Sequence, residues 1–308
     1  MTNTYSPAYD LFAAELAAPA APKLRYPSPP PGLRWLRWQL RALWAVAPAL
    51  AFRQTWQLFV APRRLPIKAW EAPVLATATR RTVATETGPV AVYEWGPAAA
   101  PAVLLVHGWE HRASFWGAWV APLRAAGYRV VALDAPAHGA SAGRSTTLVA
   151  FEAAVQAVAD TAGEVRAMVA HSFGAAAVAG LPVRLPAGAP LPRLVLLSTP
   201  LSPRAVAQRF ADFLRLPSDA VTRFVRHVER TTGRPAASFA AAATGPSIGA
   251  EKVLLLHDEA DEVIPYAEGQ QIAAAWPGAE FCGTRGLGHN RILRDAHVVR
   301  SVVEFIVG

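Results

Sequence analysis

The sequence predicts an α/β fold with a mostly parallel central sheet and helices on both of its faces. From about residue 82, short apolar runs bounded by turn residues recur to the end of the 308-residue chain. Most of these runs are separated by segments with helical periodicity. Strands that are apolar along almost their whole length and alternate with helices are typical of parallel sheets covered on both faces. We therefore expect one α/β domain over residues 82–308, preceded by an arm over residues 1–81.

Each apolar run is short enough for a strand, and most of the intervening segments are long enough for a covering helix. The expected strands are VAVYEW (90–95), AVLLVHG (102–108), YRVVALDA (128–135), RAMVAH (166–171), RLVLLS (193–198), KVLLLHD (252–258) and EFCGT (280–284). The clearest helical segments are RASFWGAWVAPLRAAG (112–127), TLVAFEAAVQAVADTAG (147–163) and AEGQQIAAAWPG (267–278). In such sheets the functional side chains gather at the carboxyl ends of the strands.

One interval breaks the alternation, because about 50 residues separate RLVLLS from KVLLLHD. Their periodicity predicts two helices, over 203–215 and 218–232. Ser218–Asp219 is the expected cap of the second helix. An insertion that follows the carboxyl end of a strand lies over the functional edge of the sheet. We therefore expect residues of about 201–250 to form a lid.

The excess positive charge lies in the arm. The chain has a formal net charge of +8, and residues 23–81 hold 11 Lys and Arg but a single acid, Glu71. Beyond residue 81 the basic and acidic residues balance at 19 each. The charge is confined to one short segment without a nucleic-acid-binding motif, so we expect no nucleic-acid partner. Proline and small residues over 18–32 predict an irregular linker.

An amphipathic helix is expected over residues 33–47 of the arm. At helical spacing, one face carries Arg34, Arg37 and Arg41, and the opposite face carries Leu33, Leu36, Leu40 and Leu43. Tryptophans lie at the flanks, at Trp35, Trp38 and Trp44. The leucine face can dock on the protein's own body. Alternatively, arginines beside tryptophans suit an anionic membrane surface, for which residues 33–60 are the candidate region. A partner protein is the third option.

The cellular compartment follows from what the sequence lacks. The first 20 residues do not combine a positive segment with an apolar core, so we expect no secretory signal. The longest apolar run of the arm, 42–52, is too short to cross a bilayer and contains Pro48. A single cysteine, Cys282, excludes an internal disulfide framework. We expect a cytoplasmic protein, with peripheral contact at the inner face of the membrane as the alternative.

The run at 166–171 leads into the motif AHSFG, in which Ser172 lies between a strand and a helix of small residues. With this motif, residues 82–308 resemble the α/β-hydrolase family, in particular its serine-nucleophile esterases and lipases. That family usually carries its nucleophile in G-x-S-x-G on a tight strand-to-helix turn. Ala170 replaces the first glycine but is still small, and Gly174 is retained. The resemblance implies Ser172 as the nucleophile.

The resemblance also implies an acid and then a histidine further along the chain. The family's acid follows an apolar strand and precedes an apolar-apolar-Pro stretch, which is Asp261 in KVLLLHDEADEVIP. Asp258 and Glu262 are rivals in the same segment, and Asp258 is expected to cap the turn. The implied base is His289 in GTRGLGHNRILRD, where Gly288 lets the loop carry the ring toward the site.

Acyl transfer also needs donors for a developing oxyanion. The resemblance implies the backbone N–H groups of Phe173 and Trp109, with His107 and Gly108 shaping the turn before Trp109. The loop LDAPAHGASAG, 133–143, matches the family's Asp-x-Pro-Gly-x-Gly-x-Ser except that Ala-His replaces the first glycine. We expect this loop to be architectural.

One rival motif overlaps the same turn. The stretch from His107 to His111 fits H-x-x-E-H, a zinc-protease pattern. That chemistry needs both histidines on one face of a continuous helix. Here the first histidine ends a strand and a glycine follows it, so we expect no zinc site.

Together these features predict a serine hydrolase that cleaves carboxylic esters or thioesters of small-molecule acyl substrates through an acyl-enzyme intermediate, without a cofactor or metal. Acyl transfer and carbon–carbon bond hydrolysis use the same machinery. The lid favours acyl chains or aromatic esters because it carries apolar side chains, at Phe210, Phe213, Phe224 and Val228. The same residues also fit plain helix packing.

Two further functions remain open from the sequence. One is a non-catalytic member of the fold that binds a small ligand or a partner, although such proteins typically lose a triad residue. The other is a peripheral membrane lipase in which the arm has the primary role.

Overall fold

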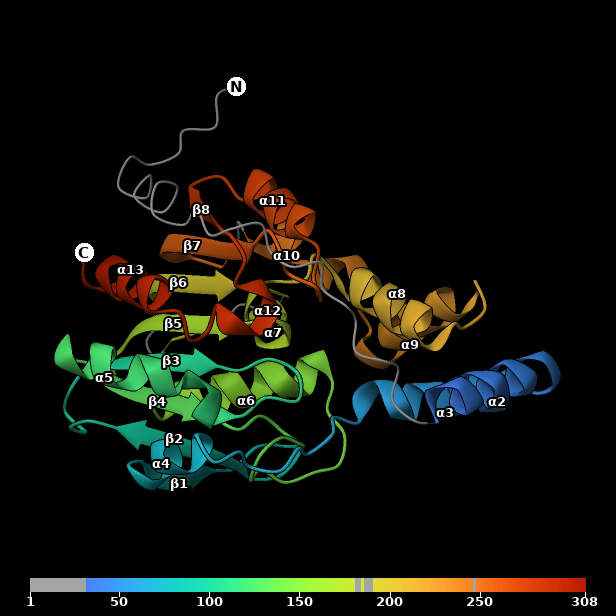
Figure 1. The fold of residues 1–308 in the computed structure, drawn as a ribbon, viewed down its shortest axis with the longest axis horizontal. Coiled ribbons are helices and arrows are strands. Elements are labelled where there is room, and N and C mark those ends of the chain that lie inside the picture. The colour runs from blue at the N-terminus through green and yellow to red at the C-terminus, as the bar shows by residue number, and fades with distance from the viewer. Residues whose placement is uncertain (1–31, 181–183, 186–190, 246–247) are drawn as a thin grey trace.

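A computed structural model describes residues 32–180, 184–185, 191–245 and 248–308. In this part of the chain eight strands form one sheet, in the order β1-β2-β4-β3-β5-β6-β7-β8 (Figure 1). β2 pairs antiparallel with β1 and β4, and all other neighbours pair in parallel. The strands are β1 (Thr79–Val83), β2 (Val90–Trp95), β3 (Ala102–Val106), β4 (Arg129–Leu133), β5 (Val165–His171), β6 (Leu191–Leu197), β7 (Ala250–Asp258) and β8 (Ala279–Thr284). The predicted mostly parallel α/β fold is confirmed. The linker expected over 18–32 lies outside the described residues apart from Gly32.

Helices cover both faces of the sheet, which is why its inner strands are apolar on both sides. Phe151, Val178 and Ile272 belong to the core on one face, and Trp119 and Val302 belong to the core on the other. The helices that carry them are α6 (Leu148–Asp160), α7 (Phe173–Gly180) and α11 (Tyr266–Ala275) on the first face, and α5 (Gly117–Ala125) and α13 (Ala296–Val307) on the second. A short 3-10 turn, η2 (Ala113–Trp116), precedes α5.

The first strand begins earlier than the sequence indicated. β1 starts at Thr79, inside the arm that we expected to end at residue 81, and pairs with β2 along its whole length. Its sequence, TRRTV, is mostly exposed because β1 is an edge strand. Arg81 of β1 donates a hydrogen bond to Glu94 of β2 over 2.6 Å. An edge strand with charged side chains lacks the apolar run by which the other strands were found.

The predicted lid is helical. Between β6 and β7 lie α8 (Pro203–Leu214), α9 (Ala220–Thr232), η4 (Ala236–Phe239) and α10 (Ala241–Thr244). Asp219 stands at the expected N-cap position of α9, but the prediction that it caps the helix is wrong, because its side chain makes no capping hydrogen bond. It instead accepts a hydrogen bond from Trp44 Nε1 at 3.1 Å and pairs with Arg223 at 2.7 Å. A partner from the arm therefore replaces the local cap.

The arm folds into a helical hairpin that packs beside the lid (Figure 1). Leu33 and Leu40 of the predicted amphipathic helix are buried against Leu214 of α8. The leucine face therefore docks on the protein's own body. The hairpin consists of α2 (Leu33–Val46) and α3 (Pro48–Val60), and a short helix α4 (Glu71–Ala76) follows before β1. None of the described helices has both the length and the apolar character needed to cross a bilayer.

The lid's aromatic residues face the arm. Phe59 of α3 lies 5.0 Å, between ring centroids, from both Phe210 and Phe224, and Phe52 lies 5.5 Å from Phe224. Phe213 is half exposed. For Phe210 and Phe224 the expected apolar cover over the site is therefore not met, because both rings pack on α3. The arm and the lid share three small hydrophobic clusters.

Candidate active site

Ser172 lies on the tight turn between β5 and α7. Its φ of 54° is in the left-handed region, which a serine adopts only when the surrounding structure holds it there. The Ser172 N–H donates to the Leu197 carbonyl of β6 at 2.9 Å, so the turn stays attached to the sheet. A Cβ at Gly174 would overlap the His107 carbonyl oxygen, and therefore only glycine lets α7 start this close to the end of β3. The fully buried Ala170 fits the same tight packing.

Three side chains from distant segments form one hydrogen-bonded chain at the carboxyl edge of the sheet. The hydroxyl of Ser172 lies 3.0 Å from His289 Nε2, and His289 Nδ1 lies 2.8 Å from Asp261 Oδ2. Ser172 follows β5, Asp261 lies in the loop between β7 and α11, and His289 lies in α12 (Gly288–Arg291) after β8 (Figure 1). Ser172 and His289 are buried but keep small exposed fractions of 8% and 5%.

Asp261 is held as an ion. Burial acts to raise its pKa, but the hydrogen bond and charge of His289 and the backbone donors outweigh burial, so its pKa is lowered from the ordinary value. The N–H groups of Val263 and Ile264 donate to Oδ1 at 2.9 and 2.8 Å, which leaves Oδ2 for His289. An ionised carboxylate on Nδ1 selects the tautomer in which Nε2 can accept a proton from Ser172.

The two rival acids hold the main chain that carries His289. Asp258 accepts hydrogen bonds from the N–H groups of Leu287 and Gly288 at 3.0 and 2.8 Å and from the Thr284 hydroxyl at 2.7 Å. It also accepts from the Ala260 N–H, as expected of a turn cap. Glu262 accepts from the N–H of His289 itself, at 3.1 Å. Neither carboxylate reaches the imidazole, so of the three acids only Asp261 meets the ring.

The predicted oxyanion donors lie in the two turns that meet at Ser172. Phe173 is the first residue of α7, where an N–H has no partner within its helix. Trp109 follows Gly108, and a Cβ at Gly108 would lie 2.9 Å from the Cβ of Ser172. Neither the Trp109 nor the Phe173 N–H donates to another group in the chain as far as the structure describes it. Both remain available to a ligand beside Ser172.

The family of the protein follows from a comparison with models of known protein families. The model of the alpha/beta hydrolase family matches residues 103–302, about two thirds of the chain. The chain belongs to the alpha/beta hydrolase family. No curated protein matches it by sequence.

Solved structures with the same fold include esterases and a thioesterase. An esterase from Pyrococcus furiosus is 19% identical with a TM-score of 0.58, covering 80% of this chain and 98% of its own. An esterase from a Rhodococcus species is 20% identical with a TM-score of 0.53, covering 74% and 98%. The thioesterase domain of the curacin biosynthetic pathway is 18% identical with a TM-score of 0.53, covering 75% and 99%. At these identities the likeness extends to the fold.

His171 packs against His289, and His111 stacks on His171; sequence analysis did not predict either placement. His171 directly precedes Ser172, its ring centroid lies 4.7 Å from that of His289, and its Nε2 lies 2.9 Å from the His289 carbonyl oxygen. His111 stacks on His171 at 5.5 Å and on Phe115 at 4.0 Å. Burial lowers the pKa of His171 well below the ordinary value and that of His111 to about 3, so both rings are neutral. The only sequence signal for His171 was its place beside the predicted nucleophile.

The loop over 133–143 supports the turn that carries Trp109. Asp134 accepts hydrogen bonds from the N–H groups of Ala113 and Ala140, both at 2.8 Å. The N–H of Ala135 donates to His107 Nε2 at 3.0 Å. These contacts are structural, as expected for the loop and for His107, and none involves Ser172.

The two histidines of the rival zinc motif, His107 and His111, do not point toward a common metal position. Both ring nitrogens of His107 are in hydrogen-bonding contact, since Nε2 accepts from Ala135 and Nδ1 lies 2.7 Å from the Gly108 carbonyl oxygen. The ring of His111 lies between Phe115 and His171 instead. In the described segments no three His, Cys, Asp or Glu side chains are grouped so that they could hold a metal ion.

Proposed function

We propose that this alpha/beta hydrolase is a serine hydrolase that cleaves carboxylic esters or thioesters through an acyl-enzyme. The observation that carries the proposal is the continuous hydrogen-bonded path from the Ser172 hydroxyl through His289 to the ionised Asp261. A serine hydroxyl is a weak nucleophile until a positioned base removes its proton, and that base needs a partner that fixes its tautomer.

In the proposed mechanism, Ser172 Oγ attacks the carbonyl carbon of the substrate while its proton passes to His289 Nε2. The carbonyl oxygen becomes an oxyanion, which the N–H groups of Phe173 and Trp109 stabilise. Collapse of this intermediate breaks the bond to the leaving group, which takes the proton from His289. Water then gives a proton to His289, attacks the acyl-enzyme, and releases the acid as Oγ regains its proton.

Apolar rings beside the serine support an acyl or aromatic substrate. The Trp109 and Phe173 rings lie 5.0 Å apart, and Phe151 lies 5.4 Å from Phe173. Trp109 and Phe173 carry the donors proposed for the oxyanion and are partly exposed, so their rings are better placed to contact an acyl group than the lid residues that pack on α3, whereas Phe151 is fully buried and supports Phe173. A small-molecule ester or thioester is therefore the proposed substrate class.

The alternatives use the same site differently. An acyltransferase would pass the acyl group to an alcohol or thiol other than water, and a non-catalytic member of the fold would bind a ligand without forming an acyl-enzyme. The intact path from Ser172 to Asp261 favours catalysis, because a ligand-binding protein has no need to keep all three groups aligned.

Covalent labelling tests the proposal. A fluorophosphonate should form one covalent adduct with the folded protein, located on Ser172 by mass spectrometry. Ser172→Ala should abolish both this labelling and the hydrolysis of p-nitrophenyl esters. Ser198→Ala is a matched control, since Ser198 is also a buried serine with positive φ at the carboxyl end of a strand. Absence of an adduct on folded wild-type protein would contradict the hydrolase and favour a binding protein.

A further inference from the structure

We propose that the α2–α3 hairpin docks on a bilayer surface that contains anionic phospholipid. The outer face of the hairpin is defined by exposed residues on both helices, namely Arg34, Trp35, Trp38, Arg41, Val46, Leu50, Arg53 and Leu58. The inference rests on this face and on the neighbouring lid helix α9. It does not depend on the chemistry at Ser172.

Large apolar side chains remain exposed on a hairpin whose own docking face is already covered. Leu33, Leu40 and Trp44 are buried against the lid. On the outer face, Trp35 and Trp38 are 62% and 67% exposed. Near the connection between the helices, Val46 is 81% exposed and Leu50 43% exposed. Tryptophan rings and aliphatic side chains presented together in this way suit the boundary between lipid headgroups and acyl chains.

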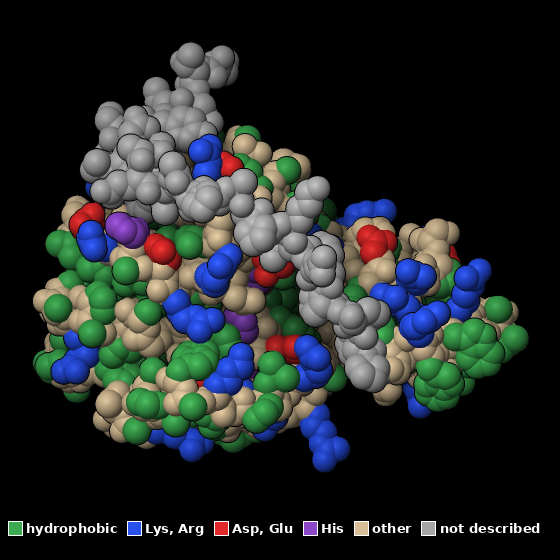
Figure 2. Space-filling view, in the orientation of Figure 1, with side chains coloured by type: hydrophobic (Ala, Val, Ile, Leu, Met, Phe, Trp, Pro, Cys, Tyr) green, Lys and Arg blue, Asp and Glu red, His purple; other side chains and the backbone are tan. Residues whose placement is uncertain are grey.

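The charge on the same segment selects an anionic partner. Residues 32–70 contain seven Lys and Arg and no Asp or Glu. Figure 2 shows Lys and Arg side chains beside exposed hydrophobic ones at the end of the molecule formed by the hairpin and the lid. A second copy of the chain would bring the same positive charge to the contact and be repelled. A bilayer with anionic lipid supplies both the opposite charge and the apolar interior.

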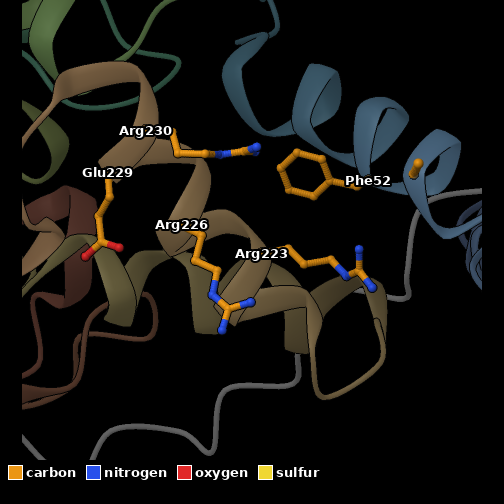
Figure 3. A pocket seen from close by; sticks show the side chains of 6 residues that line it. Phe52, Arg223, Arg226, Glu229 and Arg230 are labelled. Atoms are coloured by element: carbon orange, nitrogen blue, oxygen red, sulfur yellow. The ribbon is translucent and has the colours of Figure 1, made fainter.

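A groove beside the hairpin adds places for phosphate groups. It has a volume of about 650 Å³ and lies between α3 and α9, lined by Ala49, Phe52, Arg223, Arg226, Glu229 and Arg230 (Figure 3). Glu229 is turned away from Phe52, and its carboxylate accepts a hydrogen bond from the Ala236 N–H at 3.1 Å. Among the described residues, Arg226 and Arg230 form no ion pair, so their guanidinium groups are available to phosphate oxygens.

The hairpin lies on the same side of the molecule as the edge of the sheet that carries Ser172. α2 and α3 extend beyond the carboxyl ends of the strands, next to α8 and α9 (Figure 1). The Arg37 guanidinium donates to the Phe213 carbonyl of the lid at 2.9 Å, and Trp44 bonds to Asp219. A bilayer that holds the hairpin would therefore also hold the lid close to the lipid surface.

Flotation of the full chain with vesicles tests the proposal without any substrate. Wild-type protein should float with vesicles of phosphatidylcholine plus phosphatidylserine and not with phosphatidylcholine alone, and added salt should weaken the binding. Trp35→Ser combined with Trp38→Ser, and separately the triple variant Arg34→Gln, Arg41→Gln, Arg53→Gln, should each lower the partition coefficient on the order of tenfold or more.

A charge-matched control separates this face from net charge. Arg124→Gln, Arg144→Gln and Arg300→Gln remove the same three charges from exposed positions on the α/β body and should leave binding unchanged. Circular dichroism and thermal unfolding report whether each variant is folded. Equal loss of binding in the control, binding to phosphatidylcholine alone, or no binding of wild type would overturn the proposal. So would a wild-type dimer in lipid-free solution that the tryptophan substitutions dissociate, because the face would then meet a second copy.

Discussion

His171 links the turn that carries Ser172 to the main chain of His289. Its Nε2 lies 2.9 Å from the His289 carbonyl oxygen, and its ring packs 4.7 Å from the His289 ring. Because burial lowers the pKa of His171 well below the ordinary value, the ring is neutral, and a neutral ring adds no positive charge beside His289. The contact therefore fixes the position of the proposed base without opposing its protonation during turnover.

We predict that His171→Ala lowers kcat roughly tenfold while changing KM much less, because the His289 carbonyl loses its donor and the loop loses a packing partner. His171→Gln should restore part of the rate, since the Gln Nε2 can reach the same carbonyl. Steady-state kinetics on a soluble ester would measure both values. Equal loss in the Ala and Gln variants would mean that packing alone matters and that the hydrogen bond does not position His289.

The carboxylates of Asp261 and Asp258 should respond differently to the same substitution. Asp261→Asn removes the ion from His289 Nδ1 and is predicted to reduce kcat by about 10³–10⁴-fold. It should destabilise the fold less than Asp258→Asn, because the remaining Oδ1 can still accept from the Val263 and Ile264 N–H groups. Asp258→Asn replaces an acceptor of four hydrogen bonds at the base of the His289 loop, so it should destabilise the fold by about 1–3 kcal/mol. Urea unfolding and ester kinetics on both variants would distinguish the two roles. If folded Asp258→Asn lost more activity than Asp261→Asn, Asp258 and not Asp261 would be the acid that orients His289.

Buried neutral histidines predict a loss of stability in mild acid. Burial lowers the pKa of His111 to about 3 and of His138 to about 4, against an unfolded value near 6.5. Below about pH 6.5 the unfolded chain therefore binds more protons than the folded chain, so stability falls as pH falls. These two groups together should remove about 3 kcal/mol of unfolding free energy between pH 6.5 and 5.

Unfolding by urea at several pH values would measure this slope. His111→Gln and His138→Gln should each flatten it, whereas His297→Gln, at an exposed position on α13, serves as the control. Asp261 affects stability at lower pH than the histidines. Because its pKa is lowered on folding, its contribution to stability is fully present above its pKa in the unfolded chain and is lost only as pH falls through its pKa in the folded protein. An unchanged slope in both buried-histidine variants would show that neither ring is kept neutral by folding.

The sequence determined the fold class and the order of the site residues along the chain. Apolar runs separated by helical segments predicted seven of the eight described strands. For the inner strands the reason is that a strand buried on both faces must be apolar along its length. The turn at AHSFG was predictable because only small residues allow a helix to start against a strand. β1 was missed because an edge strand is not required to be apolar.

Only the tertiary structure decided which polar groups meet. Asp258, Asp261 and Glu262 lie within five residues, and local sequence does not state which carboxylate faces an imidazole 28 residues away. Likewise, the partner of Asp219 is Trp44, 175 residues earlier, and the lid's phenylalanines face α3. Local patterns encode backbone conformation through hydrophobic periodicity, whereas hydrogen-bond partners depend on distances between segments that come together only on folding.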